Sequence, residues 1–114
     1  MIQAELVLDN EGLLRFCKIE GHSGAETRGN DIVCASVSVL AKAIAIVLEK
    51  SKDIKVRGDI PERGSFLIEA DYNPEGKDFL KGAGSCLIEG LQAVEKEFPQ
   101  YLKVNIERRN SYGT

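Results

Sequence analysis

The sequence predicts an α+β fold in which two helices pack on a mostly antiparallel five-stranded sheet, in the order β-β-α-β-β-α-β. Three observations lead to this prediction: short segments in which apolar and polar residues alternate, two long segments with helical patterning, and turn residues between them. The 114 residues contain no repeat and no linker. We therefore expect a single domain over residues 1–114, built around one core.

The first 20 residues predict a β-hairpin. Apolar and polar residues alternate over residues 2–8, with Ile2, Ala4, Leu6 and Leu8 on one face and Gln3, Glu5 and Val7 on the other. This period of two is typical of a strand that is buried on one side. A turn at 9–12 then leads into a partner strand at 13–20.

The longest apolar segment predicts a helix. Asn30 or Asp31 can cap it, and it runs to about Lys50 after a loop at 21–30. Because it is apolar on almost every side, it needs cover from a sheet, another helix or a second subunit. Lys42 near its middle costs about 2.5–3.5 kcal/mol on membrane-insertion scales, so we expect a buried helix and no membrane span.

The second half of the chain supplies the remaining elements. Two strands are predicted at 54–57 and 65–70, joined by a turn, and 102–106 alternates as the last strand. Asn73-Pro74-Glu75 starts a second helix, and Pro99 stops it. The apolar stripe of that helix consists of Leu80, Leu87, Leu91, Val94 and Phe98.

Composition excludes several classes of protein. The net charge is −3, the pI is about 5.2 and there is no Trp, which argues against direct nucleic-acid binding. The first residues show no basic segment followed by an apolar run, so we expect no signal peptide and a cytoplasmic protein with three reduced cysteines. One histidine and three dispersed cysteines predict no metal site, and we expect no cofactor.

The segment most informative about chemistry contains a histidine on a glycine turn, Gly21-His22, and Cys34 twelve residues after it. A thiol is nucleophilic as its thiolate, which a helix N-terminus and a nearby imidazole both favour. Cys34 falls in the first turn of the predicted helix, where unpaired N–H groups can stabilise an oxyanion. His22, the only histidine, is the candidate general acid and base. The alternatives are a small buried cysteine and a histidine bonded to the backbone.

Two polar residues share the helix face of Cys34. Asp31 and Ser38 stand at i−3 and i+4 and are candidate supporting residues. As alternatives, Asp31 is an ordinary N-cap and Ser38 bonds its own helix backbone. We expect the preceding loop to be flexible in the free protein and ordered by substrate, because it has little to bury. Its glycines are Gly21, Gly24 and Gly29.

These residues resemble the signature of the ribosomal-processing cysteine proteases called Prp: Gly21-His22-Ser23-Gly24, followed by Gly29-Asn30-Asp31-Ile32-Val33-Cys34-Ala35-Ser36-Val37-Ser38. The resemblance covers nearly the whole chain. It implies a catalytic dyad of His22 and Cys34 and a homodimer. It also implies removal of a short N-terminal extension from a large-subunit ribosomal protein, by cutting after paired aromatic residues and before a small one. Ser23 and Ser36 replace alanines that are common in the family, which bears on fine specificity.

A second function is consistent with the same loop. A non-enzymatic module that associates with the ribosome or binds a phosphorylated ligand would use the glycines, Arg28 and the helix dipole. A phosphate cradle has no use for a thiol, so Cys34 and His22 together favour the peptidase.

Overall fold

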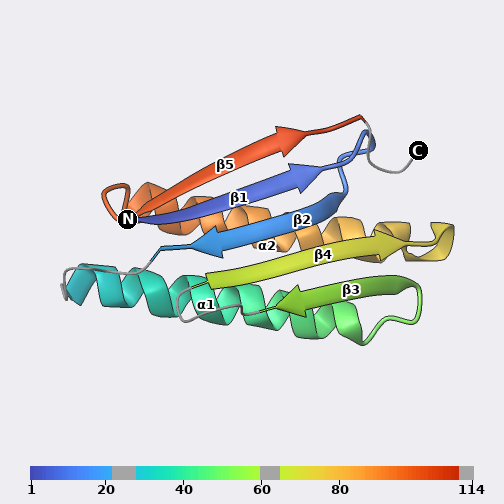
Figure 1. The fold of residues 1–114 in the computed structure, drawn as a ribbon, viewed down its shortest axis with the longest axis horizontal. Helices are drawn as coiled ribbons and strands as arrows, with labels where there is room; N and C mark the ends of the chain where they lie inside the picture. Colours follow the sequence, from blue (N-terminus) through green and yellow to red (C-terminus); the bar gives the residue numbers. More distant parts are fainter. Residues whose placement is uncertain (22–27, 60–64, 111–114) are drawn as a thin grey trace.

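Five strands and two helices follow one another in the predicted order in a computed structural model (Figure 1). The structure describes residues 1–21, 28–59 and 65–110, with backbone alone for 28–30. The elements are β1 (Ile2–Leu8), β2 (Leu14–Glu20), α1 (Arg28–Glu49), β3 (Ile54–Asp59), β4 (Ser65–Tyr72), α2 (Lys77–Glu97) and β5 (Leu102–Arg108). The α+β class predicted from the sequence is confirmed.

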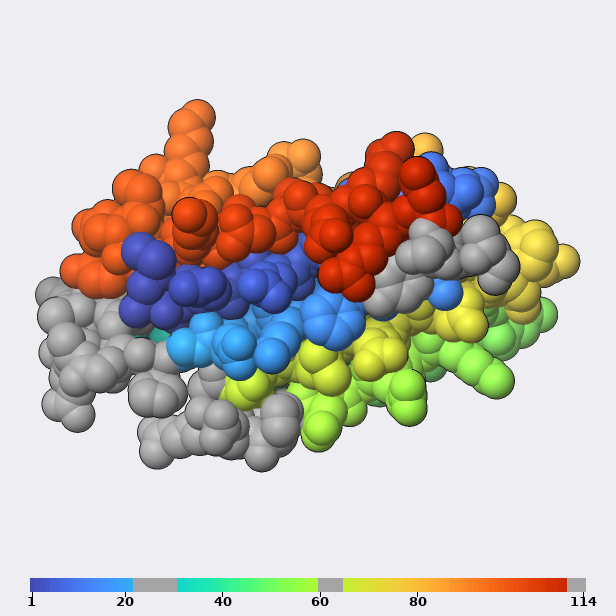
Figure 2. Space-filling view, turned by 45° about the horizontal axis from the view of Figure 1, so that its top comes forward, coloured from blue at the N-terminus to red at the C-terminus, as the bar shows by residue number. Residues whose placement is uncertain are grey.

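The strands form one mixed sheet in the order β3-β4-β2-β1-β5. Three of its pairings are antiparallel, and β1 and β5 pair in parallel. Both helices cover the same face: α1 lies over the β3 side and α2 over β2 and β5 (Figure 1). The other face is open to solvent, and β5, β1 and β2 appear on it as adjacent bands (Figure 2). The core therefore lies between one face of the sheet and the two helices.

The predicted alternation in β1 fails at its last two residues. Val7 was expected on the polar face but is buried, whereas Leu8 is only partly buried. The physical reason is a register shift: Val7 pairs with Phe16 and Leu8 with Leu14, so β2 has one extra residue, Arg15, between the two paired positions. An extra residue of this kind twists the strand and redirects the side chains beside it.

The β1–β2 turn contains a buried carboxylate that sequence patterning did not reveal. Asp9 is fully buried, and its Oδ1 accepts hydrogen bonds from the N–H groups of Glu11 (2.9 Å) and Leu13 (3.0 Å). Its Oδ2 accepts a hydrogen bond from the Tyr72 hydroxyl (2.8 Å) and lies 3.5 Å from the guanidinium of Arg15. A single acidic side chain thus ties the first hairpin to the end of β4.

Helix α1 begins earlier than predicted, at Arg28, so Asn30 and Asp31 lie within its first turn and do not cap it. Its inner face packs on the sheet through Val33, Val37, Ala41, Ile44 and Leu48. By length and composition alone the segment Asp31–Glu49 is apolar enough to cross a membrane. In this fold only one of its faces is buried, and four large apolar side chains remain exposed: Ile32, Val39, Ile46 and Val47.

Helix α2 is preceded by one turn of 3₁₀ helix, Pro74–Gly76, at the position where the sequence predicted the helix to start. Its stripe is buried at Leu80, Leu87 and Leu91 and partly buried at Val94 and Phe98. Two glycines allow it to pack closely. A Cβ at Gly84 would lie 3.0 Å from the Cβ of Leu14, and a Cβ at Gly90 would lie 2.5 Å from Leu40 Cδ2.

Candidate active site

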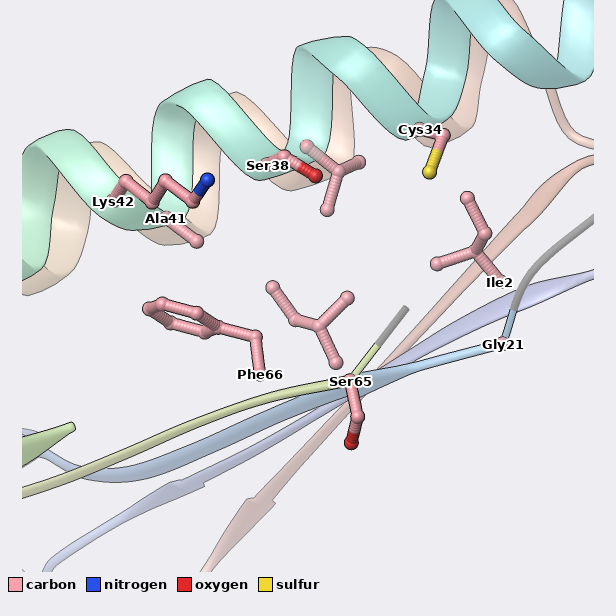
Figure 3. A pocket seen from close by; sticks show the side chains of 10 residues that line it. Ile2, Gly21, Cys34, Ser38, Ala41, Lys42, Ser65 and Phe66 are labelled. Atoms are coloured by element: carbon pink, nitrogen blue, oxygen red, sulfur yellow. The ribbon is translucent and has the colours of Figure 1, made fainter. Parts of the chain in front are cut away.

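A pocket with a volume of about 230 Å³ opens between α1 and the sheet, where β2 ends and β4 begins (Figure 3). Five of its residues come from the two strand ends and β1, and five come from consecutive turns of α1. They are Ile2, Ile19, Gly21, Ser65 and Phe66 on the sheet side, and Cys34, Val37, Ser38, Ala41 and Lys42 on the helix. The pocket is mainly apolar, with a thiol, a hydroxyl and an ammonium group on its helical wall.

Cys34 is partly buried, and its sulfur is directed toward the sheet side of the pocket (Figure 3). Because α1 starts at Arg28, Cys34 is its seventh residue and not part of its first turn. In an α-helix only the first four N–H groups lack an internal partner, and the effect of the helix dipole fades within that turn. The prediction that Cys34 lies in the first turn of the helix is therefore wrong, and its N–H is not among the unpaired groups of the helix start.

Ser38 lies one turn after Cys34 and lines the same pocket. Its hydroxyl has no hydrogen-bond partner among the residues that the structure describes. The serine that bonds the helix backbone is Ser36, whose hydroxyl donates to the carbonyl of Ile32 (2.8 Å). The structure thus leaves the Ser38 hydroxyl available to a ligand.

Asp31 lies one turn before Cys34, exposed to solvent and outside the set of residues that line the pocket. It is an acidic residue in the first turn of α1, where it interacts favourably with the helix dipole. The structure therefore brings Cys34 and Ser38 together at the pocket and places Asp31 at its margin.

Gly21 is the first residue of the predicted loop and the last described residue before residue 28, and it forms part of the pocket wall. Its φ of +114° belongs to the region that favours glycine, and a Cβ there would lie 2.5 Å from the carbonyl oxygen of Met1. His22 and Gly24 lie outside the described residues. Gly29 belongs to the first turn of α1, so the loop predicted at 21–30 is shorter than expected.

Seven pocket residues were not predicted as parts of a site, and Lys42 and Phe66 are the two that bear most on ligand binding. Lys42 follows Ser38 by one helical turn, so the spacing Cys34, Ser38, Lys42 (i, i+4, i+8) was the signal that could have identified it. Phe66 enters from β4 and lies opposite Ala41 and Lys42 (Figure 3). No sequence spacing relates it to Cys34, because only the fold brings β4 under α1.

The other two cysteines differ from Cys34 in their surroundings. Cys17 is fully buried in the core, and this burial raises the pKa of its thiol to about 12, so it is an inert packing residue. Cys86 is exposed on α2. Over 1–21, 31–59 and 65–110, no group of three His, Cys, Asp or Glu residues is arranged to hold a metal ion.

A two-layer α+β domain with a cysteine at the wall of an apolar pocket fits the class of small cysteine hydrolases. The family model described as "Cysteine protease Prp" matches residues 1–103. The chain therefore belongs to the Prp family of cysteine proteases. This membership decides against the non-enzymatic module considered from the sequence.

Solved structures share the fold over nearly the whole chain. The protein SMU.848 from Streptococcus mutans superimposes with a TM-score of 0.80 at 23% identity, covering 96% of each chain. A ribosomal processing protease Prp from S. aureus, solved in complex with a substrate peptide, gives a TM-score of 0.79 at 20% identity, covering 93% of this chain and 99% of that one. A second structure of the S. aureus protease holds a covalently linked product peptide.

A local similarity points to a different class of protein. Over 61 residues the chain is 33% identical to a rhamnosyl O-methyltransferase from Mycobacterium tuberculosis, and equally to that from Mycobacterium bovis. This match includes 54% of the chain, and it spans about a quarter (25%) of the length of the methyltransferases. It is too partial to assign the chain to their family.

Proposed function

We propose that this protease removes a short N-terminal extension from a large-subunit ribosomal protein, cutting after aromatic residues with a dyad of Cys34 and His22. Membership of the Prp family supports the peptidase, and the S. aureus relative of similar fold is a ribosomal processing protease. The single observation that carries the proposal is the position of Cys34. Its thiol opens directly onto the apolar pocket, which the hydroxyl of Ser38 also lines.

The pocket favours an apolar substrate side chain next to the reacting thiol. Its sheet side presents Ile2, Ile19 and Phe66, and its helical wall adds Val37 and Ala41. Burial of an aromatic side chain against such a surface is favourable, and an aromatic ring gains further from packing against the ring of Phe66. An aromatic residue bound in this pocket would bring its own carbonyl, which is the scissile one, close to Cys34.

In the proposed reaction, the sulfur of Cys34 attacks the scissile carbonyl carbon as its proton passes to His22. The tetrahedral intermediate collapses to a thioester, and the C–N bond breaks as His22 protonates the leaving amine. A water molecule, deprotonated by His22, then attacks the thioester, and Cys34 leaves with a proton. The Ser38 hydroxyl is placed to donate a hydrogen bond to the substrate beside the thiol.

The dyad is tested by thiol labelling in competition, with Cys86 as an internal control in the same molecule. Both Cys34 and Cys86 are accessible, but we expect iodoacetamide to label Cys34 faster because an imidazole activates only that thiol. His22→Ala should remove this advantage and lower the rate of peptide cleavage by about 10²–10⁴-fold, while the peptide still binds. Mass spectrometry of tryptic peptides measures the labelling. Equal labelling in the unsubstituted enzyme would contradict the dyad.

We also propose that the protease is a homodimer, joined partly through the outer face of α1. Ile32, Val39 and Ile46 repeat every seventh residue along that face and are exposed, with Val39 at 69%. An apolar line of this length is unusual on a free helix and typical of a helix that packs against a partner.

Light scattering should give about twice the chain mass of 12.5 kDa at micromolar concentration. Val39→Glu should shift the protein to a monomer, because two carboxylates would face each other in a dry interface. The matched control is Phe79→Glu, which adds the same charge at an exposed apolar residue of α2 and should leave the dimer intact. A monomeric mass for the unsubstituted protein would refute the dimer.

A further inference from the structure

We propose that Lys42 selects substrates that carry an acidic side chain near the scissile bond. This inference rests on the proposed function, in which the pocket beside Cys34 holds the substrate peptide. The proposal adds a preference for charge to the preference for aromatic residues described above. A lysine in a helix is ordinarily expected on the solvated face.

The position of Lys42 brings its ammonium group to the part of the pocket away from the thiol. Cys34, Ser38 and Lys42 share one face of α1, and all three line the pocket. Eight helical residues separate Cys34 from Lys42, a rise of about 12 Å. The Lys42 side chain runs back along α1 toward Ser38, which shortens this span (Figure 3). An extended peptide advances about 3.3 Å per residue, so the ammonium faces a residue about two or three positions from the scissile bond.

The charge of Lys42 is not compensated within the described residues. None of the other residues that line the pocket is charged, and the ion pairs of lysine in the described structure involve Lys18 and Lys77 instead. An ammonium group only donates hydrogen bonds, so its ligand must supply an oxygen acceptor. A carboxylate forms the strongest such bond, and Lys42 is exposed on α1, so its ammonium is accessible to one.

The surroundings of the ammonium also suit the rest of an acidic side chain. Ala41 and Phe66 lie beside Lys42 and offer apolar contact to the methylene groups of a glutamate (Figure 3). The same geometry disfavours a lysine or arginine at that substrate position, since two like charges would be held together. Lys42 therefore selects for one charge and against the other.

The test compares pairs of peptides that differ only in Glu or Gln. Each pair carries the substitution at one position within about three residues of the scissile bond, which covers the reach of Lys42. At one position the Glu peptide should be cleaved with a kcat/KM about three- to tenfold higher than the Gln peptide. High salt should reduce this ratio. Lys42→Met should bring the ratio to about one, and Lys42→Glu should make a Lys peptide the better substrate.

The matched control is Lys50→Met, which removes the same charge directly after the end of α1 and outside the pocket. It should leave the Glu-to-Gln ratio unchanged. Binding of the same peptides to a Cys34→Ala enzyme, followed by fluorescence anisotropy, should show the Glu preference without any cleavage. Should that preference appear in binding while the active enzyme cleaves nothing, the proposed function fails and the role of Lys42 stands.

Three results would overturn the proposal. The first is cleavage without a Glu preference at any scanned position. The second is a Glu preference that survives Lys42→Met. The third is a preference for Tyr over Phe with none for Glu over Gln, which would assign the ammonium to a hydroxyl oxygen instead of a carboxylate.

Discussion

Replacing Cys34 with alanine should abolish peptide cleavage, with a loss of at least about 10⁴-fold in kcat/KM. The reason is that the variant has no atom at this position able to form the acyl intermediate, and the remaining polar groups of the pocket can only bind. The protein should stay folded, because Cys34 is only partly buried and a thiol-to-hydrogen change there costs about 1 kcal/mol. Cleavage of a peptide is followed by mass spectrometry, and folding by thermal unfolding.

The control for Cys34→Ala is Cys86→Ala, the same chemical change at an exposed thiol on α2. It should keep full activity. Cys34→Ser should also be inactive, since a single histidine activates a hydroxyl far less readily than a thiol. Cleavage at a normal rate by Cys34→Ala would show that the thiol beside the pocket is not the nucleophile.

Replacing Asp9 with alanine should lower the free energy of unfolding by about 3 kcal/mol at neutral pH. This change leaves the N–H groups of Glu11 and Leu13 without their acceptor and removes the buried carboxylate beside Arg15. It also removes the acceptor of the Tyr72 hydroxyl at 2.8 Å. Urea denaturation measures the loss. Asp71→Ala removes an exposed carboxylate that contacts the same Arg15, and it should cost less than about 1 kcal/mol.

The contribution of Asp9 should depend on pH in a defined direction. Burial by itself raises the pKa of this carboxyl, but hydrogen bonds from Leu13, Tyr72 and Glu11, with Arg15 nearby, outweigh it and lower the pKa below its ordinary value. The folded protein thus favours the ionised form. Its stabilisation is complete above the unfolded-state pKa of about 4 and is lost as the pH falls through the folded-state value.

The variant Asp9→Asn isolates this charge effect, because it keeps the shape of the side chain. The difference in unfolding free energy between the unsubstituted protein and Asp9→Asn should be largest near neutral pH and should shrink as the solution is acidified below about pH 4. A difference that stays constant down to pH 2 would show that the ionised form of Asp9 does not stabilise the fold.

The sequence by itself determined the elements of this protein and the candidate for its reactive thiol. Alternation predicted β1 at Ile2–Leu8, and the apolar stripe of α2 predicted three of its buried leucines, because both signals arise from neighbouring residues that meet one common surface. The segment around Cys34 was recognisable for the same reason, since its residues are close together in the chain.

Other features were decided by the tertiary structure. The order of the strands, with β5 beside β1, depends on pairings between distant segments that leave no local pattern. The burial of Asp9 depends on Tyr72, 63 residues away. An aspartate in a turn is normally solvated when it has no such partner. The sequence at 9–12 therefore predicted a turn but not a buried carboxylate. The start of α1 at Arg28 was missed because Asn30 and Asp31 are suitable both as caps and as residues of the first turn.

The pocket is the clearest example of a feature that the tertiary structure decided. Cys34, Ser38 and Lys42 are related by helical spacing, and the sequence contains that relation. Their common face became the wall of a pocket only because the sheet placed Ile2, Ile19 and Phe66 on the other side of it. A helix face has no intrinsic function, because its solvent exposure, dielectric surroundings and ligands are set by what packs across from it. In this protein the sequence determined which chemical groups are present, and the packing of α1 on the sheet determined which of them meet.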